Sequence, residues 1–417
     1  MIENSNRVLV LSHFNDGINR VFEDYCNGIR RNAGVYRYID YIETYHQLGR
    51  RRLESLIDEE VEKYAITHVF FVWWSCDLTF SLDYLSRLSS KAKIVINYFD
   101  TEYFFEGVDR YYAQVASLVL LPDWLSRYRY EHLNIPAHTS FALYDKSAYK
   151  KLDSIEKDID VSFVGNLKQS NRAEYIDYLR SNGVNVQTYG VGSENGFASF
   201  EKMIEVFNRS KINLNFTGTA DFSGYAIRLP SINQRIKQSK GRPIEIALCG
   251  GFVLSQHAAG IENMFALGDE FDVFHTREEL LEKVRLYLSE NNRREAMAQQ
   301  AYERAIKTYD IDSGFKLVFD KLNGGNLINN SVPVCQDVEF RRNYAAFRFF
   351  YVMLFLLQFK IKLAFEEVWV VIKTRRINFS AAYHFSIRGL LHYLRARPKL
   401  EQFFKNIRKV VPVKLKY

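Results

Sequence analysis

The stretch from Lys240 to Leu254 constrains the fold more than any other part of the sequence. It begins with Lys-Gly-Arg-Pro, continues through a short apolar segment that contains Glu245, and passes through Gly250-Gly251 into a second apolar run. Proline is tolerated in the first turn of a helix because the amide that it lacks has no partner there. A glycine pair ends helices, and the apolar run is typical of a buried strand. The stretch therefore predicts a helix, a tight turn and a buried strand.

The charged residues of this stretch suit a nucleoside diphosphate. A helix N-terminus attracts phosphate through its free amides and its dipole, and Arg242 adds a fixed cation at that end. Glu245 lies just inside the same helix, where its carboxylate can accept two hydrogen bonds from a ribose diol. These parts together predict a seat for a nucleotide that carries a diphosphate.

Apolar runs alternate with amphipathic helices over the first part of the chain, which indicates an α/β domain. The run His68–Trp74 is too short to span a membrane and is typical of a central parallel strand. Ligands collect at the carboxyl ends of such strands. The predicted strands are Arg7–Ser12, His68–Trp74, Lys93–Phe99, Ser117–Pro122 and Ile135–Phe141, and the predicted helices are Arg20–Arg31, Tyr45–Tyr64 and Asp123–Leu133.

A change in composition divides the chain. Residues 145–158 are charged and poor in large apolar side chains, which predicts a linker. The strand–helix pattern restarts at Ile159, and Gly324-Gly325 marks a flexible break before the tail. With 417 residues, of which 47% are hydrophobic, the chain is long enough to bury two cores. We therefore expect domains at 1–150 and 151–325 and a basic, amphipathic helical tail at 326–417.

The first predicted strand of the second domain ends in residues that favour phosphate binding. Gly165 closes the run Ile159–Asn166 and lets backbone approach a ligand closely. Lys168 and Arg172 follow in the next loop and helix, where a diphosphate can dock. Further along the chain, Thr217 ends a predicted strand, so its loop is expected to line the cleft in which this diphosphate docks. Residues 220–239 are expected to form a surface loop or a mobile cover.

Two of these segments resemble a known family. The run K-G-R-P-I-E-I-A-L-C-G-G-F-V-L and the pattern F-V-G-N-x-x-x-x-x-R are similar to the signature of a glycosyltransferase group that includes spore-maturation-type and related cell-surface sugar transferases. The similarity is specific over about Asp158 to Leu322 and weaker over the first half. It implies the GT-B fold, in which two Rossmann-like domains face each other across a cleft and the second holds most of the nucleotide sugar.

The resemblance also implies roles for particular residues. On the donor side, Tyr189 and Gly190 are expected to border the base, Glu262 of a Gly-x-Glu element to lie near the sugar, and Lys240 to belong to the donor site with Arg242 and Glu245. On the acceptor side, the loop that contains His13, Asn15 and Asp16 is expected to face the acceptor, although Asn15-Asp16-Gly17 is also ordinary turn chemistry. Asp100 is expected near the reacting sugar, although it also suits a helix cap.

Lys237 departs from the broader retaining family, which has an acidic residue eight positions before the ribose glutamate. Stereochemistry therefore cannot be carried over from that family. Lys237 either neutralises the leaving diphosphate or is a solvated loop lysine. The same departure leaves open a second class of function, a non-catalytic membrane-associated scaffold that kept the fold.

The remaining composition bears on location and cofactors. The four cysteines form no Cys/His metal pattern, so we expect reduced thiols, no metal and no cofactor. The N-terminus lacks the order of charges and apolar residues that marks a secretion signal, which predicts a cytoplasmic active site.

The tail carries the positive charge of the chain. Residues 331–417 contain 17 Lys or Arg and 5 Asp or Glu, whereas the net charge of the whole chain is +7. The run Tyr344–Leu357 is too short and too interrupted by cations for a membrane span. Two arrangements of residues 341–417 remain open. In one, a helix lies among the headgroups of an anionic membrane, on the inner face of the plasma membrane; in the other, the helices pack back across both domains. No motif of a nucleic-acid reader is present, so no nucleic-acid partner is expected.

These observations predict a glycosyltransferase. We expect it to move a sugar from a nucleoside diphosphate to an acceptor hydroxyl, of a cell-surface glycan or a glycolipid. Arg242, Arg172 and Lys168 would neutralise the leaving diphosphate without a metal. Asp100 or Asp16 would act as the base.

Overall fold

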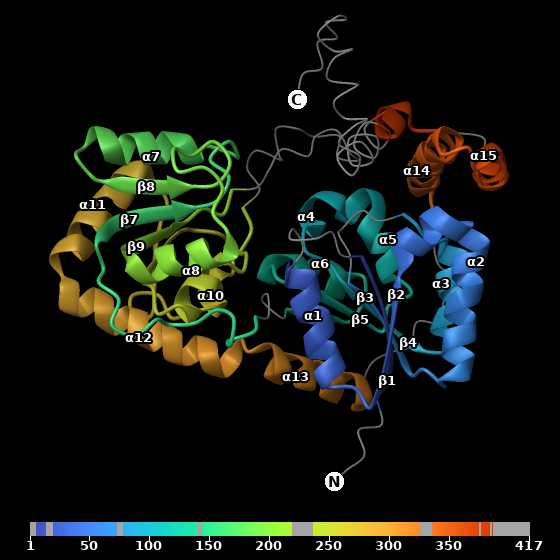
Figure 1. The fold of residues 1–417 in the computed structure, drawn as a ribbon, viewed down its shortest axis with the longest axis horizontal. Helices are drawn as coiled ribbons and strands as arrows, with labels where there is room; N and C mark the ends of the chain where they lie inside the picture. The colour runs from blue at the N-terminus through green and yellow to red at the C-terminus, as the bar shows by residue number, and fades with distance from the viewer. Residues whose placement is uncertain are drawn as a thin grey trace, which may run out of the picture.

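The computed structural model describes residues 6–13, 20–72, 78–139, 144–218, 237–325, 336–374, 377–383 and 386. Two parallel sheets with flanking helices form two domains (Figure 1). The α/β architecture with two Rossmann-like domains that the sequence predicted is confirmed.

The first sheet has six parallel strands in the order β2-β1-β3-β4-β5-β6. The order reverses at β1, whose neighbours β2 and β3 lie on its two sides, and such a switch point is where open α/β sheets bind ligands. The strands are β1 (Arg7–Ser12), β2 (Val35–Asp40), β3 (His68–Val72), β4 (Lys93–Asn97), β5 (Leu118–Leu121) and β6 (Ala137–Thr139). The helices within this half are α1 (Arg20–Arg31), α2 (Tyr41–Lys63), α3 (Leu82–Ser89), α4 (Thr101–Phe104), the π-helix η1 (Phe105–Asp109), α5 (Arg110–Ala113) and α6 (Trp124–His132).

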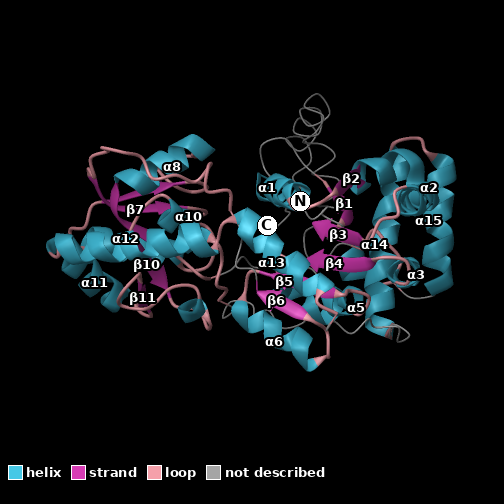
Figure 2. Cartoon of the chain, turned by 90° about the horizontal axis from the view of Figure 1, so that it is seen from below, coloured by secondary structure: helices cyan, strands magenta, loops and turns pink. Residues whose placement is uncertain are grey.

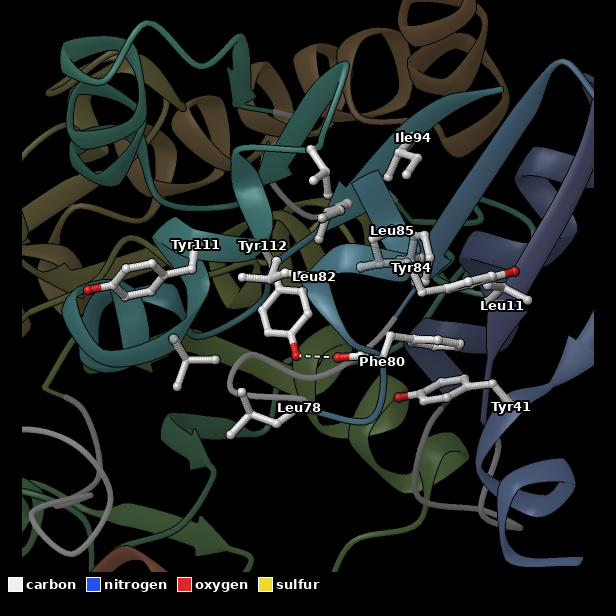
Figure 3. Close-up of a cluster of buried hydrophobic side chains, with 14 of the residues drawn as sticks. Leu11, Tyr41, Leu78, Phe80, Leu82, Tyr84, Leu85, Ile94, Tyr111 and Tyr112 are labelled. Atoms are coloured by element: carbon white, nitrogen blue, oxygen red, sulfur yellow. Dashed lines mark hydrogen bonds between the residues drawn. The ribbon is translucent and has the colours of Figure 1, made fainter. Parts of the chain in front are cut away.

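The two faces of this sheet bury different residues. Val8 and Val10 of β1 pack with α1 into one core, whereas Leu9 and Leu11 pack into another with α2 and α3. This alternation follows from the two-residue period of a strand. Figure 3 shows part of the second core, where the Tyr112 hydroxyl donates a hydrogen bond of 2.7 Å to the carbonyl of Phe80.

The second sheet has five parallel strands in the order β11-β10-β9-β7-β8. Here the order reverses at β7, between β9 and β8. The strands are β7 (Ile159–Val164), β8 (Val186–Tyr189), β9 (Ser210–Asn215), β10 (Val253–Gln256) and β11 (Asp272–Phe274). The helices are α7 (Arg172–Ser181), α8 (Phe200–Arg209), α10 (Arg242–Leu248), the 3-10 helix η2 (Ile261–Asn263), α11 (Arg277–Ser289) and α12 (Asn291–Thr308).

The chain returns to the first sheet after α12. Helix α13 (Ile311–Asn323) lies within the range predicted for the second domain, yet its Phe315 and Phe319 pack in one core with Val8 and Phe70 of the first sheet. Figures 1 and 2 both show α13 reaching from the end of α12 to the first domain. At the crossing, Tyr144 pairs with Asp310 in a parallel bridge.

Two further helices, α14 (Val338–Leu357) and α15 (Ile361–Thr374), form a hairpin on the first domain. Phe340, Tyr351 and Phe355 of α14 and Ala364 of α15 belong to the core that contains α2 and α3. Among the residues that the structure describes, no helix combines the length and the apolar character needed to cross a membrane.

Candidate functional site

A cavity of about 430 Å³ lies between the carboxyl ends of the two sheets. Gly165 and Asn166 follow β7, and Asn215 and Phe216 close β9, so the wall of the second domain coincides with its switch point. The remaining lining residues are Val21, Phe22, Phe99, Asp100, Pro122, Tyr144, Phe163, Val164, Gln169, Arg172, Lys240, Gly241, Arg242 and Glu245.

Glu245 faces this cavity from the first turns of α10 and is 8% exposed. Arg242 Nη1 donates a short hydrogen bond to the Glu245 carboxylate, so the two residues form an ion pair within the helix. Burial raises the pKa of Tyr144 well above its usual value, and the charge of Glu245, which is hydrogen-bonded to the tyrosine, adds to the rise. The site therefore holds its carboxylate between a cation and a phenol.

Arg172 is the buried cation of the site. It is the first residue of α7, is 9% exposed, and donates to the carbonyls of Asn166 at 3.1 Å and Gly218 at 2.8 Å. Its buried Nε has no hydrogen-bond partner among the described residues. Burial, and then repulsion from Arg242, lower the pKa of Arg172 to about 10, so it stays charged at neutral pH. Two guanidinium groups that repel each other beside a cavity favour an anionic ligand there.

Two glycines allow the backbone to close behind the site. Gly190 has a φ of +115°, and a Cβ at that position would lie 2.2 Å from the carbonyl oxygen of Gly165. The amide of Gly165 donates to the carbonyl of Tyr189 at 2.8 Å. Gly190 therefore supports the Gly165 loop from behind and does not itself line the cavity.

Asp100 contributes a carboxylate from the first domain. Lys240 Nζ donates to Asp100 Oδ1 at 2.8 Å, so residues predicted to serve the acceptor and donor sides meet across the cavity. The capping role that competed for Asp100 is not observed, because its side chain makes no cap hydrogen bond to α4.

The sequence reasoning missed a second contact between the domains. Asp123 caps α6 through the amide of Ser126, and its other oxygen accepts from the amide of Ser239 at 3.0 Å and its hydroxyl at 3.1 Å. Burial, followed by the charges of Asp123 and Asp100, raises the pKa of Glu102 well above its usual value. The sequence offered one signal for this contact, the carboxylate of Asp123 directly after a predicted strand.

Besides Gly190, four predicted donor residues lie outside the cavity lining. Lys168 is exposed, and the Tyr189 hydroxyl donates to Gln187 Oε1 at 2.8 Å. Thr217 is buried and donates to the carbonyl of His257 at 3.1 Å. Glu262 pairs with His257 at 2.7 Å. Strand and loop positions were predicted for these residues, but sequence spacing does not give side-chain direction.

The other predicted acceptor-side residues either do not line the cavity or lie outside the described residues. His13 Nδ1 lies 3.0 Å from Asp40 Oδ1, at the carboxyl ends of β1 and β2, and does not line the cavity. Asn15 and Asp16 lie outside the described residues, as do residues 220–236 of the predicted cover. Lys237 is exposed and forms an isolated bridge with Gly218. In the described part of the chain, no group of three or more His, Cys, Asp or Glu side chains is arranged to hold a metal.

Comparisons with known proteins support the family resemblance and the fold. A sequence model of the glycosyl transferase-like family matches residues 152–316. No curated protein sequence matches the chain significantly.

Several solved structures share the fold at low sequence identity. HepE of Anabaena, solved in complex with UDP, has a TM-score of 0.53 and 13% identity, over 76% of this chain and 100% of that one. A glycosyltransferase of Rickettsia africae has a TM-score of 0.53 and 9% identity, over 77% and 98%. Sucrose-phosphate synthase of Thermosynechococcus elongatus has a TM-score of 0.53 and 8% identity, over 77% and 100%.

Proposed function

Because residues 152–316 match the glycosyl transferase-like family and the chain has the GT-B fold, we propose that it transfers a sugar from a nucleoside diphosphate to an acceptor hydroxyl. HepE has been solved with UDP-glucose, which supports a uridine diphosphate sugar as the donor class. The acceptor belongs to a cell-surface glycan or a glycolipid, as the sequence resemblance suggests.

One observation carries the proposal: Arg172, Arg242 and Glu245 converge on the cavity at the switch point of the second sheet. The diphosphate lies against the two guanidinium groups, whose mutual repulsion it relieves. The ribose hydroxyls take the place of Arg242 as donors to the Glu245 carboxylate, which frees Arg242 for phosphate. Binding therefore replaces the ion pair within α10 with two contacts to one ligand.

The reaction then needs charge stabilisation on the leaving group. The bond between the anomeric carbon and the diphosphate oxygen breaks, its electron pair stays on the diphosphate, and the acceptor oxygen forms the new bond. Arg172 and Arg242 stabilise the developing negative charge, and the proposal needs no metal for this step. Asp100, at the opposite wall of the cavity, lies close to the reacting sugar and accepts the proton that the acceptor hydroxyl releases.

Thermal unfolding in the presence of UDP tests the donor site. A ligand that binds only the native state stabilises it by RT ln(1 + [L]/Kd), so UDP at about 100 times its Kd adds about 2.7 kcal/mol. We expect Glu245→Ala to remain folded and to lose most of this UDP-induced rise in Tm. Glu282→Ala, an exposed glutamate of α11, serves as the matched control. An undiminished rise in Glu245→Ala would contradict the ribose contact.

Turnover separates the enzyme from a scaffold that kept the fold. We expect the purified protein to release UDP from a panel of UDP-sugars, slowly by hydrolysis and faster with a suitable acceptor. Binding of UDP with no hydrolysis or transfer for any donor in the panel would favour the non-catalytic alternative.

A further inference from the structure

Helix α15 exposes a stripe of large apolar side chains. Ile361, Phe365, Trp369 and Ile372 are 49%, 67%, 57% and 59% exposed. At 100° per residue these positions cover roughly 80° of the helix circumference, so they form one continuous face. The opposite side of the helix buries Ala364 and Glu367 against the first domain. An exposed aromatic face of this size marks an interaction surface.

The loop between the two helices and the end of α14 also expose apolar side chains. Phe359, which joins the helices, is 88% exposed, and Leu356 and Leu357 close to it are also exposed. Met353 and Phe349, one and two turns earlier on α14, are exposed as well. We call the exposed apolar residues from 349 to 372 the hairpin face.

The exposed charges beside the stripe of α15 are positive. Lys362 and Lys373 are exposed and border the apolar stripe on one side, and Lys373 Nζ lies 5.6 Å from the centroid of the Trp369 ring. Of the two acids of α15, Glu367 is buried with Arg348 at 3.4 Å, and Glu366 is half-buried. The hairpin face therefore presents aromatic and aliphatic side chains beside cations, which complements an apolar layer covered by anions.

The hairpin is fixed to the first sheet at the carboxyl ends of its strands, where Asp100 also lies. Arg348 is completely buried, and its guanidinium donates to the carbonyls of Leu78 and Thr79, in the connection after β3. Asn343 Nδ2 donates to the carbonyl of Gly107, after β4, at 3.3 Å. The hairpin thus lies beside the carboxyl ends of the strands, and Figures 1 and 2 place it next to α2, at the end of the first domain away from the second sheet.

We propose that the hairpin face docks the protein on an anionic phospholipid surface, with α15 lying in the headgroup region. Interfacial helices bury an apolar face of this kind to the depth of the headgroup boundary while their lysines contact lipid phosphates. The surface binds lipid whatever reaction the cleft performs. If the proposed transfer is correct, docking also brings the strand-end edge of the first domain towards acceptors that are held in the same membrane.

Vesicle flotation of the full chain tests the proposal. We expect the parent protein to float with vesicles that contain phosphatidylglycerol and to bind vesicles of pure phosphatidylcholine at least tenfold more weakly. Phe365→Ser/Trp369→Ser should lose at least tenfold in partition coefficient. Lys362→Gln/Lys373→Gln should lose about 30-fold on anionic vesicles, since each lysine near such a surface contributes about a factor of five.

Matched variants guard against general effects of charge or solubility. Phe197→Ser removes a phenylalanine that is 86% exposed in the second domain, and Lys307→Gln/Lys316→Gln removes two exposed lysines from α12 and α13. We expect both to float like the parent, and all variants to keep the parent Tm and its response to UDP. Three results would overturn the proposal: no flotation of the parent, equal loss in the control variants, or a parent dimer that Phe365→Ser/Trp369→Ser converts to a monomer, which would identify the face as a contact between two copies.

Discussion

Arg172 shows how a single residue can destabilise the fold and yet favour the binding of an anionic ligand. Its guanidinium is buried, one of its nitrogen atoms lacks a partner among the described residues, and Arg242 repels it. Burial of an incompletely paired charge destabilises the native state unless an anion completes its hydrogen bonds. Lys168 was predicted as a cation of the same site, but it is exposed, so its charge does not carry this cost of burial.

His68 should make the stability of the protein sensitive to acid. It is 3% exposed at the start of β3, and burial, with a smaller effect of Lys93, lowers its pKa to about 4. The unfolded chain protonates this residue near its ordinary pKa of about 6.5, so stability is lost as the pH falls from about 6.5 to 4. Between pH 7 and 5 this residue should account for a loss of about 2 kcal/mol.

Urea unfolding at pH 7 and pH 5 measures this effect. In His68→Gln the loss of unfolding free energy between the two pH values should be smaller than in the parent by about 2 kcal/mol, whatever the variant costs at pH 7. His132→Gln, at an exposed histidine, should behave like the parent. A His68→Gln variant with the full parental loss would show that His68 is not the titrating group.

At the scale of single elements, the sequence predicted those whose signals are local. Helix α1 has its predicted bounds, Arg20–Arg31, and its charges suit the helix dipole, with Glu23 in the first turn and Arg30 and Arg31 in the last. Strand β2 was missed because it is an edge strand with every residue half-buried, which leaves no clear apolar alternation. Its omission also shifted the predicted start of α2 from Tyr41 to Tyr45, since Asp40 at the end of β2 is the cap.

The close packing of the strand ends at Gly165 and Gly190 should not tolerate a side chain. Gly190→Ala places a methyl group against the Gly165 carbonyl and requires a positive φ, so we expect a loss of about 2 kcal/mol or more in unfolding free energy. The displaced Gly165 loop should also reduce the UDP-induced rise in Tm.

Gly183→Ala separates crowding from backbone strain. Gly183 has a φ of +82° but nothing within 4 Å of its Cβ position. We expect this variant to lose about 1 kcal/mol and to keep the parental response to UDP. If Gly190→Ala and Gly183→Ala lost the same unfolding free energy and responded equally to UDP, the contact between Gly190 and the Gly165 loop would be unimportant.

At the scale of the whole molecule, the ion pair between Asp100 and Lys240 should matter for turnover more than for folding. The Lys240 side chain is 44% exposed, so Lys240→Met should lower the unfolding free energy by less than about 1 kcal/mol. The pair positions the two walls of the cavity, so Lys240→Met and Asp100→Asn should each reduce the transfer rate at least tenfold. The double variant should be no slower than the slower single one.

Lys91→Met is the matched control, because it removes surface ion pairs with Asp58 and Glu62 just before β4, at the end of the strand opposite the cavity. It should leave the transfer rate at the parental value. Parental transfer by Lys240→Met would contradict a role for the pair in joining the walls.

Sequence patterns predicted the two sheets and the end of each strand at which ligands gather, but they did not predict how the chain crosses between the domains. The apolar positions of α13 indicate only that one face of the helix is buried. That face packs on the first sheet through Phe315 and Phe319, and this choice depends on shapes that form only in three dimensions. The ion pair of Arg242 with Glu245 likewise depends on side-chain direction.

The crossing of α13 also sets the order in which the protein can fold as it leaves the ribosome. The first domain is synthesised first, but its sheet lacks the covers α13 and α14 until after the second domain has emerged. The cores of the second domain come almost entirely from residues 144–309, so this domain can fold before α13 is synthesised. The apolar faces of the first sheet therefore stay exposed while some 180 further residues are synthesised, from the end of β6 to the end of α13. This is the period in which a chaperone would bind the first domain.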